Sequence, residues 1–348
     1  MRMQHLFKIL LIVCLNPWSP CFAATQETVV RNIPLAAPLN DPIAEYSGMT
    51  WCGDRLFLIP QYPKRLGKKH SASDRSYFYT LAKQDILDFL QGRRTQALQG
   101  QAIELLEGSV RARTLAFDGF EAAACDGKTL WLTIESVGLF QRFRRFRRFS
   151  SFLVPADIVE QNNGKTTLVL QTDRIKKLGS QSKLENKGDE ALTIWKQQVI
   201  TFHEVNSSTV INQPVAQAFN KHSGEKALYK FPHIPYRLTD ATTVDQQGRF
   251  WGINYRYNRD QFSDDIVDTI AQQHGQGQSH QRYDNVERLL EFQIDEGGVY
   301  LVNQPPIQLE MTSSEGRNWE AIVRLDDLGF LIATDKYPGS LLGFVPLK

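Results

Sequence analysis

Residues 117–136 read FDGFEAAACDGKTLWLTIES, and this stretch decides the fold of the chain. A short apolar run carries Glu121 near its start, and the polar turn Asp126-Gly127-Lys128 follows it. A second apolar run, Thr129 to Ile134, ends at Glu135. Asp-Gly between two such runs indicates a tight β-hairpin. The stretch therefore predicts two antiparallel strands whose carboxylates lie fourteen positions apart.

The same pattern occurs at four other places in the 348 residues. Each copy starts with an acidic residue, passes through small and apolar residues to a polar turn, and ends on an acid or an amide. The first-strand acids are Glu45, Glu121, Glu190, Asp240 and Glu320, and the second strands end at Gln61, Glu135, Glu204, Asn254 and Asp335. A period of roughly 50–75 residues is typical of a propeller blade with insertions.

These repeats predict an all-β chain folded as one β-propeller domain over residues 24–348, with five blades preferred over six. A strand from the N-terminal part, within Thr28 to Ile33, is expected to join the last blade and close the ring, which hides the sheet edges. Residues 258–285 are polar and rich in Gln, and we interpret them as an insertion.

The first 23 residues have the pattern of a signal peptide. Arg2 and Lys8 precede the apolar run Ile9 to Leu15, and small residues near Ala23 suit cleavage there. We expect export to the periplasm or the medium. Removing Arg2 and Lys8 from 40 basic residues leaves 38, which equals the 38 acidic ones. A neutral exported chain is not expected to bind nucleic acid, and we expect a monomer.

Cys52 and Cys125 remain after the signal peptide, each in the turn after the first strand of a repeat. An oxidising compartment permits a disulfide, although equivalent positions on different blades need not lie within bonding distance. Both outcomes stay open. The spacing of Cys and His shows no zinc or iron–sulfur motif.

The repeated acid, apolar run, turn and terminal acid resemble the phytase-like (esterase-like activity of phytase) β-propellers, a family of exported bacterial proteins. More distantly, the repeated acids resemble those of the calcium-dependent propeller phytases and apyrases. The resemblance covers most of the mature chain through short motifs. It implies a propeller fold and chemistry on phosphorylated substrates. The chain has no GxSxG motif that would supply an esterase nucleophile.

In a propeller the first strands line the central channel, so the first-strand acids are expected to form a ring of carboxylates there. Such a ring needs a cation or hydrogen bonds to stay ionised. Oxygen ligands suit Ca²⁺ or Mg²⁺, and the candidate ligands are Glu45, Glu121, Glu190, Asp240, Asn254 and Glu320. The alternative is that these acids accept hydrogen bonds from the backbone of neighbouring blades. Glu135, Glu204 and Asp335 are expected nearer the mouth, and they are the candidate catalytic residues.

The segments after the second strands are basic and rich in Tyr, which predicts a rim that binds a small anionic molecule. The candidate binding residues are Lys64, Arg65, Arg142, Arg145, Tyr255, Arg256, Lys336 and Tyr337. Phe140 to Phe149 alternates Phe with Arg, which suits a peripheral membrane contact, a lid over an anion, or Phe packed on a blade with solvated Arg. His203 is expected to point away from Glu204, into the core or between blades.

Two functions follow from these features. The first is a metal-assisted hydrolase, in particular a phosphoester hydrolase, that acts on a phosphorylated or other anionic substrate at the channel mouth. The alternative is a non-catalytic envelope protein that binds an anionic ligand or partner at the same mouth. A propeller fold by itself does not choose between them.

Overall fold

The computed structural model describes residues 25–64, 75–114, 117–137, 149–184 and 187–347. The predicted signal peptide, Arg65, Arg142, Arg145 and residues 140–148 lie outside this part of the chain. Within the described residues no helix is long and apolar enough to cross a membrane.

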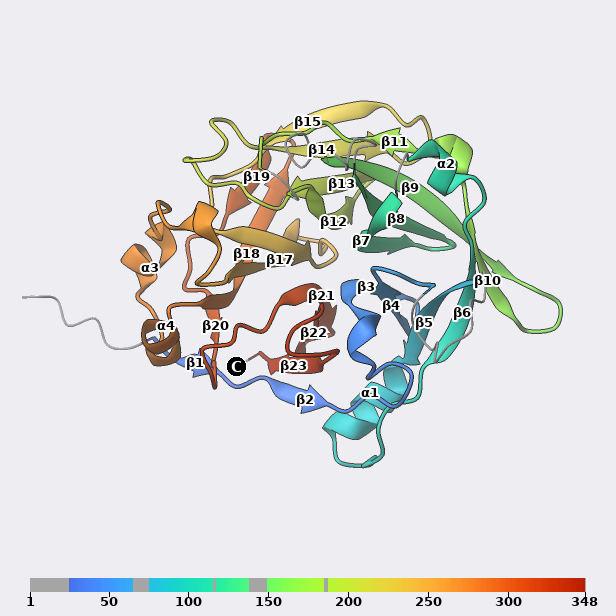
Figure 1. Cartoon of the computed structure of the whole chain (residues 1–348), viewed down its shortest axis with the longest axis horizontal. Coiled ribbons are helices and arrows are strands. Elements are labelled where there is room, and N and C mark those ends of the chain that lie inside the picture. The colour runs from blue at the N-terminus through green and yellow to red at the C-terminus, as the bar shows by residue number, and fades with distance from the viewer. Residues whose placement is uncertain (1–24, 65–74, 115–116, 138–148, 185–186, 348) are drawn as a thin grey trace, which may run out of the picture.

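The described residues form five antiparallel units arranged around a centre (Figure 1). The strands of unit 1 are β3 (Tyr46–Cys52), β4 (Arg55–Pro60), β5 (Ser76–Ala82) and β6 (Gln101–Leu106). Those of unit 2 are β7 (Phe117–Asp126), β8 (Thr129–Val137), β9 (Phe149–Glu160) and β10 (Thr166–Leu170). Those of unit 3 are β12 (Asp189–Trp195), β13 (Gln198–His203), β14 (Val215–Asn220) and β15 (Lys226–Lys230).

The last two units continue this order. Unit 4 comprises β16 (Arg237–Ala241), β17 (Arg249–Arg256), β18 (Val286–Asp295) and β19 (Gly298–Leu301). Unit 5 comprises β21 (Trp319–Leu325), β22 (Gly329–Thr334), β23 (Leu342–Pro346) and, from the N-terminal part, β2 (Arg31–Ile33). Each unit begins with one of the five hairpins found in the sequence.

The first strands make a closed ring. Strand β3 contacts β7, β7 contacts β12, β12 contacts β16, β16 contacts β21, and β21 returns to β3. Inner hydroxyls tie neighbours together: Ser47 Oγ donates to the Phe120 carbonyl oxygen over 2.5 Å, and Thr239 Oγ1 donates to that of Trp319 over 2.7 Å. The predicted all-β propeller is confirmed by this arrangement.

Short elements lie outside the units. Strand β1 (Glu27–Thr28) pairs in parallel with β20 (Ile307–Leu309), and β11 (Lys176–Lys177) pairs with β9. The helices are α1 (Lys83–Leu90), α2 (Val110–Arg113), α3 (Thr269–His274) and α4 (Gln278–Tyr283), with 3₁₀ turns at Pro42–Ala44, Thr172–Arg174 and Gln261–Ser263. Helices α3 and α4 occupy the stretch that the sequence indicated as an insertion, at the edge of unit 4 (Figure 1).

The core fills the spaces between adjacent units, so the strands are apolar on both faces. Between units 3 and 4, the Phe202 ring stacks on Phe250 with 5.3 Å between centroids, and Phe250 stacks on Phe292 at 5.2 Å. These rings are fully buried. Offset stacking adds to the free energy gained by burying aromatic surface, which holds neighbouring sheets at a fixed separation.

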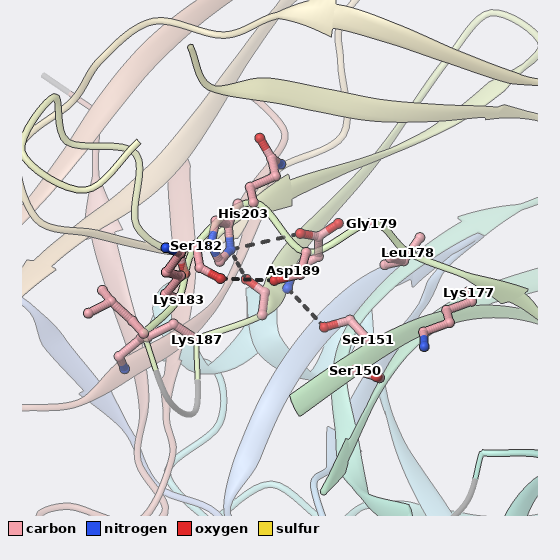
Figure 2. A pocket seen from close by; sticks show the side chains of 14 residues that line it. Ser150, Ser151, Lys177, Leu178, Gly179, Ser182, Lys183, Lys187, Asp189 and His203 are labelled. Atoms are coloured by element: carbon pink, nitrogen blue, oxygen red, sulfur yellow. Dashed lines mark hydrogen bonds and ion pairs between the residues drawn. The ribbon is translucent and has the colours of Figure 1, made fainter. Parts of the chain in front are cut away.

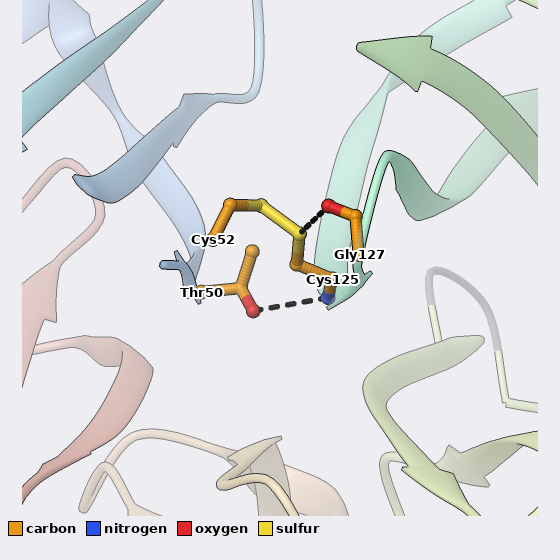
Figure 3. The surroundings of a disulfide bond; sticks show 4 residues. All are labelled: Thr50, Cys52, Cys125 and Gly127. Atoms are coloured by element: carbon orange, nitrogen blue, oxygen red, sulfur yellow. Dashed lines mark hydrogen bonds between the residues drawn. A yellow bond between two sulfur atoms is a disulfide. The ribbon is translucent and has the colours of Figure 1, made fainter. Parts of the chain in front are cut away.

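Cys52 and Cys125 form a disulfide that joins the first hairpins of units 1 and 2 (Figure 3). Their Cα atoms lie 5.5 Å apart, and the Cys125 amide donates to Thr50 Oγ1 over 3.2 Å. The bridge lies at the hairpin-turn end of the ring, opposite the end where Glu45 and Glu121 lie. The pairing that the sequence left open is therefore formed.

Candidate functional site

The starts of the first strands and the ends of the second strands meet at one end of the ring, which we call the mouth. Antiparallel pairing causes this: Asp189 lies opposite His203, and Trp319 lies opposite Thr334. The two sets of acids predicted from the sequence therefore converge at the mouth.

Irregular pairing directs the first-strand acids inward. In units 3 and 5 the register shifts between Asp189 and Ala191 and between Trp319 and Ala321, so that Glu190 and Glu320 are the extra residues. A bulged residue has no partner across the ladder and turns its side chain away from the regular alternation. Both carboxylates are buried.

Arg237, the first residue of β16, holds the centre of the mouth. Its guanidinium donates to Glu204 Oε1, to Glu320 Oε1 over 2.8 Å, and to Glu190 Oε2 over 3.5 Å. It also donates to Asn318 Oδ1 over 3.3 Å, and it lies 5.4 Å from the centre of the Tyr255 ring. One cation thus joins carboxylates from units 3 and 5.

Arg237 is marked in the sequence by a repeated position. A basic residue stands three positions before the first-strand acid in three units, at Lys187, Arg237 and Arg317. Lys187 donates to Glu204 Oε1 over 2.9 Å, which adds a second cation to the mouth. Arg317 instead pairs with the buried Glu287 at 2.7 Å. Two of the three repeated cations, Arg237 and Lys187, therefore bond carboxylates at the mouth. We call these two cations and Glu190, Glu204 and Glu320 the mouth network.

The carboxyl groups at the mouth differ widely in pKa. Burial by itself would raise the pKa of Glu204, but Arg237 and Lys187 outweigh it and lower that pKa to about 2. Burial raises the pKa of Glu320 to about 7 even though Arg237 favours its ionised form. Burial and the charge of Glu204 raise the pKa of Glu135 to about 7 as well. Separated pKa values in one site are the condition for acid and base roles.

The pKa values of three further acids at the mouth are also raised. Burial, then the charge of Glu135, raises the pKa of Glu121, whose Oε1 accepts from Gln61 Nε2 over 3.0 Å. Burial and the charge of Glu204 raise the pKa of Glu190, and burial raises that of Asp335. Near neutral pH the mouth therefore holds fewer negative charges than its carboxyl groups suggest.

The three predicted catalytic acids share a feature. Glu135 Oε1, Glu204 Oε2 and Asp335 Oδ1 are each buried with no hydrogen-bond partner among the described residues. A buried polar atom without a partner costs about 1–3 kcal/mol, and native proteins usually satisfy such atoms with water, a proton or a ligand. These oxygens are thus suited to bonds beyond the described protein atoms.

A pocket of about 680 Å³ opens over Arg237 between units 4 and 5. Its wall includes Arg237, Tyr255, Tyr257, Arg259, Asn318 and Tyr337. Tyr255 is buried and Tyr337 is 64% exposed, so the pocket runs from the network to the surface. Arg259 lies 5.6 Å from the centre of the Tyr257 ring.

The six predicted metal ligands do not form one ligand set. Asp240 Oδ2 accepts from the Ile322 amide over 2.8 Å, which is the structural alternative that the sequence left open. Asn254 Nδ2 donates to the carbonyl oxygens of Pro235 and Arg237, and its Oδ1 accepts from Arg288 over 2.8 Å. Within the described ranges no group of three or more His, Cys, Asp or Glu side chains is placed to hold a metal ion. The other four are Glu45, Glu121, Glu190 and Glu320, and they lie around the mouth.

The described rim residues separate into two groups. Tyr255 and Tyr337 line the pocket, as the prediction requires. Lys64 lies 3.9 Å from Glu107, Arg256 pairs with Asp284 at 2.8 Å, and Lys336 lies 3.8 Å from Glu45. These three basic residues have carboxylate partners and do not line the pocket.

His203 is buried and faces the space between units 2 and 3 rather than the mouth network, as strand alternation predicted.

Comparisons with known proteins bear on the fold. No family model matches the chain, and no curated protein matches it in sequence. The chain is similar in structure to a GH43 endo-arabinanase from Bacillus licheniformis, with 9% identity, 90% of this chain and 96% of that one covered, and a TM-score of 0.47. It is also similar to a luciferin-regenerating enzyme, with 9% identity, 92% of this chain and 96% of that one covered, and a TM-score of 0.46. A third similar structure is a glucose dehydrogenase, with 9% identity, 92% of this chain and 100% of that one covered, and a TM-score of 0.45.

Proposed function

We propose that the mouth is the active site of a hydrolase that acts on a phosphorylated or other anionic substrate. The observation that carries this proposal is the separation of pKa values around Arg237: about 2 for Glu204 and about 7 for Glu320. Glu204 stays ionised and keeps the guanidinium in place. Glu320, 2.8 Å from that guanidinium, holds a proton near neutral pH and can give it up.

The roles follow from charge. Burial raises the pKa of Glu190 and raises that of Glu320 to about 7, whereas Glu204 stays ionised, so less negative charge opposes Arg237 and it can attract an anion in the pocket. Arg259 adds a second guanidinium to the wall. In the proposed reaction a water molecule attacks the electrophilic centre and the ionised fraction of Glu135 takes a proton from it. Glu320 gives its proton to the leaving-group oxygen as the bond to that oxygen breaks.

The metal assistance predicted from the sequence does not fit the residues at the mouth. Arg237 and Lys187 already occupy the places where a cation would balance Glu204, and two of the six predicted ligands are bonded elsewhere. No step is assigned to a metal. Export, the predicted membrane contact of Phe140 to Phe149 and membership of the phytase-like family remain predictions.

A binding protein for an anionic ligand is the second candidate, and one observation favours it. The pocket wall contains Arg237 and Asn318, whereas Glu135, Glu204 and Glu320 lie behind them. An anion could therefore bind to the guanidiniums and the Tyr side chains without reaching Glu135, Glu204 or Glu320. Asp260 and Glu315 also line the pocket, so the anion must fit beside these two acids.

The test compares hydrolysis of nitrophenyl phosphate, bis-nitrophenyl phosphate and nitrophenyl acetate with and without EDTA. We expect hydrolysis that survives EDTA, a kcat/KM that falls above about pH 7 as Glu320 ionises, and a loss of about 100-fold or more in Glu320→Gln. Glu310→Gln, at an exposed acid just after β20, is the control. Equal activity of Glu320→Gln and wild type would refute the assignment. No hydrolysis, together with a higher melting temperature in phosphate that Tyr337→Ala removes, would favour the binding protein.

A further inference from the structure

A second cavity, of about 550 Å³, lies between units 2 and 3 (Figure 2). Strands β9 and β11 bound it on one side and the start of β12 and the end of β13 on the other. The segment from Leu178 to Leu184 crosses it. The pocket over Arg237 has a different wall, so the two cavities are separate spaces.

His203 contributes a buried ring nitrogen to this cavity. The side chain is 2% exposed, and Nδ1 lies 2.6 Å from the Gly188 carbonyl oxygen. A carbonyl oxygen only accepts, so Nδ1 carries the hydrogen. Nε2 has no hydrogen-bond partner among the described residues. In the neutral ring Nε2 is therefore a free acceptor that can take a hydrogen bond from a hydroxyl group.

The Asp189 carboxylate lies beside the His203 ring. Its Oδ1 lies 3.9 Å from His203 Nδ1, while its Oδ2 accepts from Thr201 Oγ1 over 2.6 Å and from Gln217 Nε2 over 2.9 Å. The Asp189 amide donates to Ser151 Oγ over 3.3 Å, and Figure 2 shows this chain of contacts along one side of the cavity. The 2.6 Å bond to the Gly188 carbonyl oxygen therefore orients the imidazole, with the Asp189 carboxylate beside it, and leaves Nε2 for a ligand.

Lysines and a serine give the same cavity positive charge and a hydroxyl group. Lys177, Lys183 and Lys187 line the cavity, and Asp189 is the acid among the described lining residues. Within the described part of the chain, Lys177 and Lys183 have no ion pair, whereas Lys187 donates to Glu204. Ser182 Oγ is buried without a partner among the described residues. Ammonium groups and a hydroxyl together favour an oxyanion.

We propose that this cavity binds a small hydroxylated oxyanion, with Lys177, Lys183 and Ser182 on the anionic group and His203 Nε2 on a hydroxyl of the ligand. The shared chemistry is a phosphate or carboxylate on a short carbon chain that carries a hydroxyl. Lys187 joins the two sites, because it lines this cavity and bonds Glu204 at the mouth.

The experiment follows the His203 ring nitrogens by NMR in protein labelled with ¹⁵N-histidine, assigned by the signal lost in His203→Gln. The two probes are glycerol 3-phosphate and glycerate, which show whether the cavity prefers a phosphate or a carboxylate. Glycerol, which has the hydroxyl groups but no negative charge, is the control. We expect hydrogen on Nδ1, and a saturable shift of Nε2 with at least one of the anions. The proposal is overturned if neither anion moves the His203 signals, even at about tenfold the concentration that would saturate a site with a millimolar dissociation constant.

Variants at exposed positions keep the test independent of folding. Lys177→Ala with Lys183→Ala should weaken the binding seen at His203 by about tenfold or more, and Lys128→Ala, at an exposed turn, should leave it unchanged. Tyr337→Ala alters the pocket over Arg237 and should also leave it unchanged. Unaltered affinity in the double variant would overturn the proposal, and so would loss of the His203 shift in Tyr337→Ala. A hydrolase assay at the mouth can fail while this titration succeeds, so the two proposals are tested separately.

Discussion

Replacing Glu320 by Gln should change the pH dependence of stability in a direction that the mouth network fixes. The pKa of Glu320 is about 7 in the folded protein, against an ordinary value of 4.5. Because the folded state binds the proton more tightly, the stability that Glu320 contributes is present below about pH 4.5 and is lost as the pH rises to about 7. A difference of about 2.5 in pKa corresponds to about 3 kcal/mol.

Glutamine has nearly the shape of the protonated side chain, and its amide oxygen can still accept from Arg237. The free energy of unfolding of Glu320→Gln should therefore increase by about 2.5 kcal/mol relative to wild type between pH 5 and pH 8, which is most of the full difference. Other acids that titrate in this range, including Glu135, are present in both proteins, so the comparison largely removes their effect. Urea unfolding at the two pH values measures the difference.

Glu310→Gln serves as the control, because it removes an exposed acid outside the mouth, just after β20, and should give equal differences at pH 5 and pH 8. The reasoning is refuted if the free energies of unfolding of wild type and Glu320→Gln differ by the same amount at both pH values. The burial of an ionisable Glu320 beside Arg237 would then not affect stability as the pH changes.

Three other perturbations test the remaining contacts. Arg237→Met should cost about 3–5 kcal/mol at pH 8, because the three buried carboxyl groups around it lose their shared cation, and less at pH 5, where Glu320 is protonated; urea unfolding at both pH values shows whether the cost is the same. Replacing Cys52 and Cys125 by Ala should cost about 4 kcal/mol, as the bridge closes a loop with a sequence separation of 73; if reductant destabilises wild type and this variant equally, the bridge does not contribute. Trp319→Phe should cost about 1–3 kcal/mol, because the buried Glu287 loses the 2.8 Å bond from the indole nitrogen; guanidinium unfolding at pH 7 measures it, and an unchanged midpoint would contradict the role of that bond.

Much of the fold could be predicted from local patterns. The hairpin at residues 117–136, for example, needs only two apolar runs and an Asp-Gly turn, and all of these features lie within 20 residues of sequence. Repetition of that unit predicted the propeller, and β2 pairs with β23 within the range expected for ring closure.

The site was harder to predict, because side chains at bulges do not follow the alternation of a regular strand. One extra residue reverses which face the following side chains occupy. Asp240 and Glu320 stand at the same place in their repeats, yet Asp240 bonds the backbone of the next unit and Glu320 meets Arg237. Equivalent sequence positions therefore acquired different roles.

The sequence alone determined the repeating hairpin, the strand order and the end of the ring at which the acids gather, since each depends on residues near one another in the chain. Only the tertiary structure decided that Arg237 pairs with Glu190, Glu204 and Glu320, that Cys52 meets Cys125, and that His203 faces a cavity between two units. The physical reason is that these contacts join different units. Their distances depend on how the sheets pack around the centre, which no local pattern encodes.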